Sequence, residues 1–494
     1  ASSKKAKMSE EETEGIDRIS NLPKPLLHHI MYFLPPSEIT ILMFVSKSFL
    51  STYRSSPFLD FDYYSKFRER SMRSFSDFVL ESLQRHMLVD TNLLRLSLTY
   101  GGYEDDEAQN LLETLERFVT HKKVQHLILS FQPIYLSPYL SDSFFSLQTI
   151  KTVSLQGLSF KTQSLILSCP LLESFTLHDC SGIKSFEVSN SQLKSVEFSH
   201  CNELEVIRII EAAATSLQSF SYTGDSLEQP QLNIEITSSK SLKTLELKNI
   251  NNIGELLGFS KFTLLETLIL MDCREGITRN ININSCTSLK FIKLWNTVVT
   301  EDWFSANYFA LQFVESFKLG HCPSLRRFDV KFEHLKEFEL LVHWKYELAP
   351  WELSNFIIEA PKLDFFTYSP GHTPPHPPVV ICSNLNAKLQ FHNLSKSLSG
   401  DGYYKALRDF LVSFDHCKTL TIACSSQEVL IFPEIERSDF FSPLYDLKHL
   451  HIMLKQHKTM IEEFLESLLW LAPRLNTLSI AIDSKDSNVQ GTLQ

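Results

Sequence analysis

The chain has 494 residues, and with only 14 glycines it contains no glycine- and serine-rich linker that would divide it into several domains. Its formal net charge of −11 argues against nucleic acid as a partner, because phosphate binding needs clustered basic side chains. We find no apolar run long enough to span a membrane and no apolar N-terminal signal segment. We therefore expect no membrane partner, and a location in the nucleus, the cytoplasm or both.

Residues 1–18 are expected to form a flexible tail, and residues 19–62 predict a small helical unit. Three amphipathic helices are expected over residues 23–33, 37–44 and 46–54, with a break at Pro35 and Pro36. Pro25 falls in the first turn, where its missing N–H group costs nothing. So small a unit cannot bury all of its apolar side chains, so we expect a partner to cover some of them.

A repeat follows a helical linker and cap at residues 63–92. The frame LxxLxL recurs at Leu172, Leu193, Leu242, Leu265, Leu289 and Val314, in steps of 21 to 25 residues apart from one step of 49 that contains a weaker copy at Leu217. Weaker frames begin at Leu93, Val124, Ile150, Leu335, Leu363, Asn386, Cys417, Leu447 and Leu475. A period in the twenties is typical of leucine-rich repeats, in which each unit adds one strand to a parallel sheet. We therefore predict an α/β solenoid of about 16 units with a curved sheet over residues 93–482, and a C-terminal tail at 483–494.

The return segments between these strands differ along the chain. Residues 183–188, 204–209 and 325–330 alternate polar and apolar side chains and predict strands, whereas residues 106–123 and 460–472 have helical spacing. We therefore expect helices near both ends of the solenoid and a strand-lined middle. The segments 296–309, 342–353 and 369–378 are expected to be loops on one rim. His372 and His376 in the last of these are too isolated to indicate a metal site.

Four of the nine cysteines stand eight residues after a frame leucine, at Cys180, Cys201, Cys273 and Cys322. In leucine-rich repeats this position turns inward at the end of the strand, so we expect buried, reduced thiols. A zinc site is disfavoured because the spacing equals the repeat length and no CxxC motif occurs.

The positions between the frame leucines should lie on the concave face of the sheet. In the first half they are mostly Ser and Thr, but near the frames at Leu265 to Leu335 they become apolar and cationic. Exposed apolar and Trp side chains beside lysines are typical of interface anchors. The expected substrate-binding residues are Ile269, Met271, Phe291, Lys293, Trp295, Lys318 and Leu341, with Trp303, Trp344 and Tyr346 from the rim loops. The alternative is that a loop of the chain itself covers them.

Residues 19–62 resemble the F-box, with the pattern I-x-x-L-P-x-x-L-L-x-x-I-x-x-F-L-P and a later Ser-Lys pair followed by an aromatic residue. The matching residues are Ile19, Leu22, Pro23, Leu26, Leu27, Ile30, Phe33, Leu34, Pro35, Ser46, Lys47 and Phe49. The segment departs from the family at Lys24, where an acidic residue is usual, and at Phe49, where tryptophan is usual. Together with the repeats, it resembles the plant F-box/leucine-rich-repeat group over nearly the whole chain.

This resemblance implies the substrate-recognition subunit of an SCF ubiquitin ligase. The F-box would bind a Skp-family adaptor and through it a cullin scaffold, and the repeats would hold the protein to be ubiquitinated. The expected adaptor-binding residues are Leu22, Pro23, Leu26, Leu27, Ile30, Phe33, Leu34, Pro35, Ile39, Val45, Lys47 and Phe49. The resemblance implies no catalysis and no resident cofactor.

Two alternatives remain open. One is a repeat scaffold that never joins a ligase. The other is a receptor that needs a small molecule over an inositol polyphosphate, for which the face offers only the scattered cations Arg95, Lys248, Lys293, Lys318 and Lys388.

Overall fold

The repeated leucine frames become parallel strands in the computed structural model. It describes residues 22–34, 38, 41–42, 46–66, 72–88, 93–101, 105–132, 137–190, 192–225, 231–237, 239–250, 253–257, 262–273, 281–342, 355–370, 379–382, 385–391, 403–455, 462–482 and 490–493. The chain divides into two units, residues 1–183 and 184–494. Within the described part, no helix combines the length and the apolarity needed to cross a bilayer.

Unit 1 contains a parallel sheet whose strands follow one another in chain order. These are β1 (Phe58–Asp62), β2 (Arg95–Tyr100), β3 (His126–Phe131), β5 (Thr152–Gln156) and β8 (Ser174–His178). Short strands β4 (Tyr139–Leu140), β6 (Ser159–Phe160) and β7 (Ser164–Leu167) and the 3-10 helix η1 (Asp142–Ser146) lie in the return segments. Alternate residues of the main strands are buried, as the leucine frame predicts.

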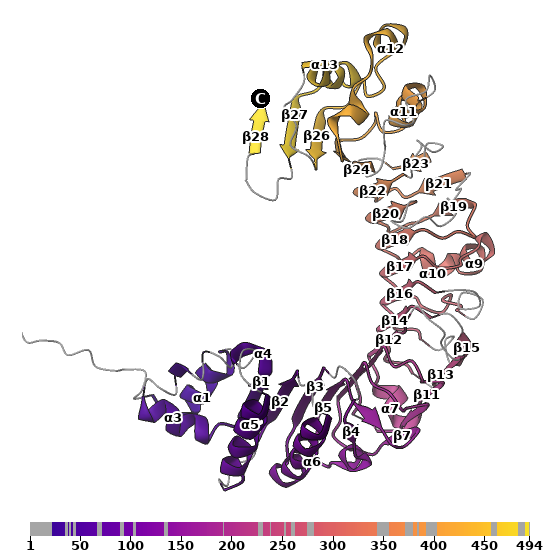
Figure 1. Ribbon diagram of the computed structural model, residues 1–494. Helices are drawn as coiled ribbons and strands as arrows, with labels where there is room; N and C mark the ends of the chain where they lie inside the picture. The colour runs from indigo at the N-terminus through magenta and orange to yellow at the C-terminus, as the bar shows by residue number, and fades with distance from the viewer. Residues whose placement is uncertain are drawn as a thin grey trace, which may run out of the picture. The chain divides into compact units, whose positions relative to one another are not determined.

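The helices of unit 1 are α1 (Lys24–Tyr32), α3 (Lys47–Arg54), α4 (Tyr63–Lys66), α5 (Met72–Met87) and α6 (Asp105–Lys122). The helix predicted over residues 106–123 is confirmed by α6, which packs beside α5 (Figure 1). Helix α5 lies in the range 63–92, where we expected a helical linker and cap. Strand β1, which lies in the range 19–62, was not anticipated as part of the ladder. Because β1 pairs in parallel with β2, the ladder begins before residue 93.

Unit 2 continues the pattern with a longer main sheet. Its parallel strands are β10 (Ser195–Ser199), β12 (Ser219–Thr223), β14 (Thr244–Lys248), β16 (Thr267–Met271), β17 (Phe291–Trp295), β18 (Ser316–Gly320), β20 (Glu337–Leu341), β22 (Phe365–Ser369), β24 (Asn386–Phe391), β25 (Thr419–Cys424), β26 (His449–Leu454) and β27 (Thr477–Ile482), and β28 (Gln490–Leu493) adds to β27 in antiparallel fashion. Each of the sixteen predicted frames coincides with a described strand, and β1 and β28 join the sheets in addition.

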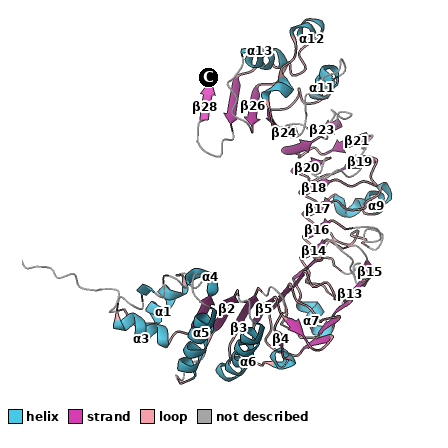
Figure 2. Cartoon of the chain, viewed as in Figure 1, coloured by secondary structure: helices cyan, strands magenta, loops and turns pink. Residues whose placement is uncertain are grey.

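The return segments of unit 2 form a second layer on one side of the main sheet. Two smaller parallel sheets contain β9 (Ser185–Val188), β11 (Val206–Ile209), β13 (Leu232–Ile236) and β15 (Ile253–Leu257), and then β19 (Arg327–Lys331), β21 (Asn355–Glu359) and β23 (Val379–Ile381). The predicted strands at 183–188, 204–209 and 325–330 are thus confirmed. Figure 2 shows the helices α9 and α11 on this same side.

The helices of this layer are α7 (Glu211–Ser216), α9 (Glu301–Ala306), α10 (Tyr308–Leu311), α11 (Tyr403–Val412), α12 (Glu434–Asp439) and α13 (Glu462–Leu471), with η4 (Gln427–Leu430). Helix α13 confirms the helix predicted at 460–472. The segment 296–309, which we expected to be a rim loop, instead contains α9 and the start of α10.

Phenylalanine replaces leucine at core positions in unit 2 and forms columns of stacked rings. The Phe317 and Phe338 ring centroids lie 5.5 Å apart, and Phe338 stacks on Phe366 at 6.0 Å. In the second layer, Phe328 and Phe356 stack at 5.1 Å. Because each ring contacts the equivalent ring of the next repeat, the core is continuous from strand to strand.

The ends of the main strands share a backbone feature. A residue with φ between 44° and 55° follows six of them: Asp179, His200, Asn249, Asp272, Asn296 and His321. This left-handed conformation is unfavourable for most side chains but is tolerated by Asn, Asp and His. The chain therefore turns sharply at the same point in these six repeats, which aims the next side chain into the core.

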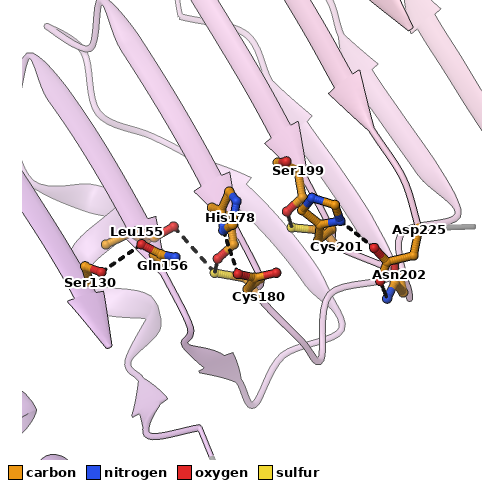
Figure 3. Close-up of polar contacts among 11 residues, drawn as sticks. Ser130, Leu155, Gln156, His178, Cys180, Ser199, Cys201, Asn202 and Asp225 are labelled. Atoms are coloured by element: carbon orange, nitrogen blue, oxygen red, sulfur yellow. Dashed lines mark hydrogen bonds and ion pairs between the residues drawn. The ribbon is translucent and has the colours of Figure 1, made fainter. Parts of the chain in front are cut away.

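In several repeats the side chain that follows the left-handed residue bonds to main-chain oxygens. Figure 3 shows Cys180 with its Sγ 3.3 Å from the His178 oxygen and 3.7 Å from that of Leu155 in the preceding repeat. Cys273 lies 3.4 Å from the Leu247 oxygen, and Thr297 takes the same role at Leu270. Cys180, Cys201, Cys273 and Cys322 are buried free thiols. This contact fixes the register of neighbouring repeats. It thereby also fixes the positions of the side chains on the face of the sheet that points away from the core.

Candidate functional site

The N-terminal helical unit has a small apolar core between α1 and α3. Leu27 and Met31 of α1 are 1% and 3% exposed, and they pack with Phe49 of α3. Helix α3 begins at an ordinary cap, because the Ser46 hydroxyl accepts a hydrogen bond of 3.0 Å from the Ser48 N–H group. His28 Nε2 lies 3.0 Å from the Thr52 carbonyl oxygen and links the two helices. The unit is therefore ordered by its own contacts.

The other side of α1 leaves large apolar side chains exposed. Leu26 is 50% exposed, Ile30 36% and Phe33 69%. We call these three residues the α1 face, because their spacing of four and three residues places them on one side of the helix. Ile41, which follows α1 in the chain, is 59% exposed. A group of this kind on so small a unit is typical of a docking surface.

The structure separates the residues that we expected to bind the adaptor. Leu26, Ile30 and Phe33 are exposed, as are Pro23 and Lys47, and Leu22 and Leu34 are half-buried against the core. Leu27 and Phe49 are core residues, so the prediction that they lie on the contact surface is wrong. The reason is helical geometry, which turns Leu27 about 100° away from Leu26. Pro35, Ile39 and Val45 lie outside the described residues.

The helical unit is attached to the ladder by a different side from the α1 face. Tyr53 of α3 meets His86 of α5 edge-to-face, with ring centroids 6.2 Å apart. Burial raises the pKa of Tyr53 to about 12 and lowers the pKa of His86. Both rings are thus held in their neutral forms at this junction. The α1 face takes no part in the contact.

The second candidate surface is the side of the main sheet in unit 2 that the return layer does not cover. Leu268 and Leu270 of β16 point into the core, so Ile269 and Met271 lie on the opposite side. Register places Ile269 beside Lys293 of β17, and Met271 beside Trp295. We define the β17 patch as Ile269, Met271, Phe291, Lys293 and Trp295. The structure thus brings these five predicted residues together.

Trp295 is less exposed than the sequence suggested. It is 9% exposed because its indole lies against Gly320, the neighbouring residue in register on β18. A Cβ atom at Gly320 would approach the indole Cε3 atom to 2.5 Å. The expectation of a wet Trp295 anchor is therefore wrong, because the indole packs against Gly320 of the next strand. The Lys293 ammonium lies 5.2 Å from the Trp295 ring centroid.

Most cations of the sheet face are neutralised by carboxylates. Lys318 forms an ion pair of 2.9 Å with Glu339, and this hydrogen bond raises the pKa of Lys318. Lys248 pairs with Glu246, and in unit 1 Arg95 pairs with Asp60 at 2.6 Å. Three of the five cations considered for a polyphosphate are therefore engaged by protein carboxylates. Leu341 of β20 is half-buried on the same side as Lys318.

Of the three substrate contacts predicted in the rim loops, the structure describes only Trp303, and it does not join the patch. Trp303 is 6% exposed in α9, where its Nε1 donates a hydrogen bond of 2.9 Å to the Ile281 oxygen. It is a core residue of the return layer, and its assignment to substrate binding is wrong. Trp344 and Tyr346 lie outside the described residues, as do His372 and His376. No cluster of three or more potential metal ligands occurs in the described part of the chain.

The face of unit 1 is polar and internally hydrogen-bonded. Ser130 donates to Gln156 Oε1 at 2.7 Å across neighbouring strands (Figure 3). His126 Nδ1 lies 2.9 Å from the Thr152 hydroxyl. This agrees with the expected hydroxyl-rich surface. Phe365 was missed: it occupies the same strand position as Phe291 and is 58% exposed. Its place two residues after the frame leucine Leu363 was the available signal.

Comparisons with known proteins agree with this architecture. The F-box domain model matches residues 19–60, and the model described as the LRR domain of At1g61320/AtMIF1 matches residues 119–337. The chain is 25% identical over 288 residues to the putative F-box/LRR-repeat protein At3g18150 of Arabidopsis thaliana, which covers 51% of this chain and 60% of the relative.

Two further Arabidopsis thaliana proteins show similar levels of identity. The putative F-box/FBD/LRR-repeat protein At4g03220 is 28% identical over 232 residues, covering 41% of this chain and 46% of the relative. F-box/LRR-repeat protein 25 is 26% identical over 204 residues, covering 35% and 72%. For the first two of these three relatives, the chain spans between about half and three fifths of the relative's length.

Proposed function

We propose that this chain, a plant-type F-box/leucine-rich-repeat protein with an F-box domain ahead of its repeats, is the substrate-recognition subunit of an SCF-type ubiquitin ligase. In this role the F-box binds a Skp-family adaptor and through it a cullin scaffold. The sheet face of the repeats binds the target protein. The chain performs no bond chemistry itself.

The observation that carries this proposal is the α1 face. Leu26, Ile30 and Phe33 lie within the segment that matches the F-box model, yet the core of that segment is completed by other residues. Burying three such side chains against a partner would contribute several kcal/mol, at about 25 cal/mol for each Å² of apolar surface. The ladder contacts the unit elsewhere, through Tyr53 and His86, so the α1 face is accessible to a separate subunit.

The test is capture of a purified Skp-family adaptor by the full chain. Leu26→Asp and Phe33→Asp each place a charge on the α1 face without touching Leu27, Met31 or Phe49. We expect each to weaken adaptor capture by at least about tenfold, because a buried unpaired carboxylate is costly. A change of Leu27 is unsuitable as a test, since Leu27 is a core residue and its loss would unfold the unit.

The matched control is Leu171→Asp, which introduces the same charge at a leucine that is 45% exposed in unit 1, compared with 50% for Leu26. Capture by this control should equal that of the unmodified chain. Circular dichroism should show equal folding of all variants. If the unmodified chain captures no adaptor, or if both α1-face variants still capture it fully, the proposed function is contradicted. The hypothesis of a repeat scaffold that never joins a ligase then explains the data better.

A further inference from the structure

The charges on the sheet face around β17 are distributed unevenly. On β14, Lys248 pairs with Glu246, and Lys318 of β18 pairs with Glu339 of β20. Lys293 lies between these two pairs, on β17, and is the direct neighbour of Lys318 in register. Among the described residues, no carboxylate forms an ion pair with Lys293. The positive charge of Lys293 is therefore not balanced by an ion pair with a described carboxylate, although Glu337 and Glu339 of β20 lie on the same face.

The surroundings of Lys293 are apolar. On its own strand, Phe291 and Trp295 flank it on the same side of the sheet, and Ile269 lies beside it on β16. All of these side chains are partly or largely buried, and the ammonium group already lies over the Trp295 ring. A partner that covers the apolar side chains must also remove water from Lys293. Removing water from an ammonium group is costly unless the partner supplies an anion.

The cations of the β17 patch restrict the chemical class of the partner. A polyphosphate requires several converging cations, but the ammonium of Lys318 is held by Glu339. A basic segment would be repelled by the ammonium group of Lys293. One carboxylate between apolar side chains satisfies both the charge and the apolar surface of the β17 patch.

We propose that the β17 patch binds a segment of the target protein in which one Asp or Glu is flanked by large apolar residues. This inference rests on the proposed function, because it names the chemistry of the target that the repeats would hold. Lys293 supplies the charge recognition. Ile269, Met271 and Phe291 supply the apolar contact area, and the Trp295 ring holds the lysine in place from below.

The experiment uses the full chain and a defined peptide array. Each 11-residue peptide has a central Glu, Gln or Lys, and the two residues on either side are varied over Leu, Ile, Met and Phe. We expect binding to Glu-centred peptides to exceed binding to the matching Gln-centred peptides by about tenfold. Lys293→Met should abolish this preference while it keeps the apolar selectivity, and Lys293→Glu should transfer the preference to Lys-centred peptides.

Lys362→Glu is the matched control, because it reverses the charge of an exposed lysine in the turn before β22. It should leave the preference unchanged. Equal binding of Glu- and Gln-centred peptides, binding of none of them by the folded chain, or an unaltered preference in Lys293→Met would each overturn the inference. If Lys293→Glu fails to fold, Lys293→Met alone decides the point.

Adaptor capture on the same preparations separates this inference from the proposed function. Loss of the peptide preference with capture intact rejects only the chemistry assigned to the β17 patch. Absence of adaptor capture with the preference intact rejects the ligase role and leaves an acidic-peptide-binding surface on the repeats.

Discussion

Gly320 allows the Trp295 indole to lie flat on the next strand, and Gly320→Ala should displace it. The added Cβ would lie 2.5 Å from the indole Cε3 and 2.8 Å from Cδ2 and Cζ3. Carbon atoms pack at about 3.5–4.0 Å, so the ring must move by roughly 1 Å. Overpacking of this kind costs about 1–3 kcal/mol, and removing a glycine from a strand returns about 0.5–1 kcal/mol.

We therefore expect Gly320→Ala to lower the stability of the chain by about 1–2 kcal/mol. Urea unfolding followed by tryptophan fluorescence measures this change, and the emission of the folded variant should shift to the red as Trp295 becomes wetter. The decisive comparison is made in a Trp295→Ala background. There the clash is absent, so Gly320→Ala should be neutral or stabilising. An equal loss of stability in both backgrounds would refute the proposed contact.

Two further predictions concern buried titratable groups. Burial lowers the pKa of His86 below its ordinary value of 6.5. As the pH falls below about 6.5, the unfolded chain therefore binds a proton at His86 before the folded chain does. The stability of the folded chain should decline as a result, by at most about 1.4 kcal/mol per pH unit from this residue. His86→Gln should reduce the pH dependence of the urea midpoint between pH 7.5 and 5.5, and an unchanged slope would contradict it. Burial also raises the pKa of Cys273 and Cys322 to about 12, whereas Cys382 is only half-buried. Iodoacetamide at pH 7.5 should label Cys382 before the buried cysteines, as followed by mass spectrometry. Equally rapid labelling of Cys273 in the folded chain would argue against its burial.

The sequence predicted the ladder well because its signal is periodic. Each leucine frame places two core side chains on one strand, and even Cys417, which replaces the leading leucine, begins a frame that coincides with a strand. The frame at Asn386 was placed too late in its repeat, because Asn386 pairs with Phe365 and Thr419 rather than with the leading residues of those frames. The return strands were also predictable, since alternation in residues 204–209 is visible locally. Strand β1 was missed because it lies within the range that matched the F-box pattern.

The candidate surfaces were harder to predict, because exposure depends on the neighbour as well as on the strand position. The alternation placed Trp295 on the open face correctly, but its burial depends on Gly320, which is 25 residues later and adjacent only through strand register. Trp303 was assigned to a loop because its segment lacks a long helical pattern, yet α9 needs only six residues. In the helical unit, the pattern marked Leu26 and Leu27 alike, although in α1 only Leu27 of this adjacent pair faces the core.

The left-handed residues at the strand ends have a consequence for how this molecule can diversify. His200, Asn249 and Asp272 set the turn by backbone conformation, and the inward thiols behind such turns bond to main-chain atoms rather than to particular side chains. The turns of the scaffold are thus specified at the strand ends, by backbone conformation and main-chain contacts. Side chains such as Lys293 can therefore be replaced on one strand at a time without a change in the turns at the strand ends. The recognition surface can vary in this way while the repeat architecture stays the same.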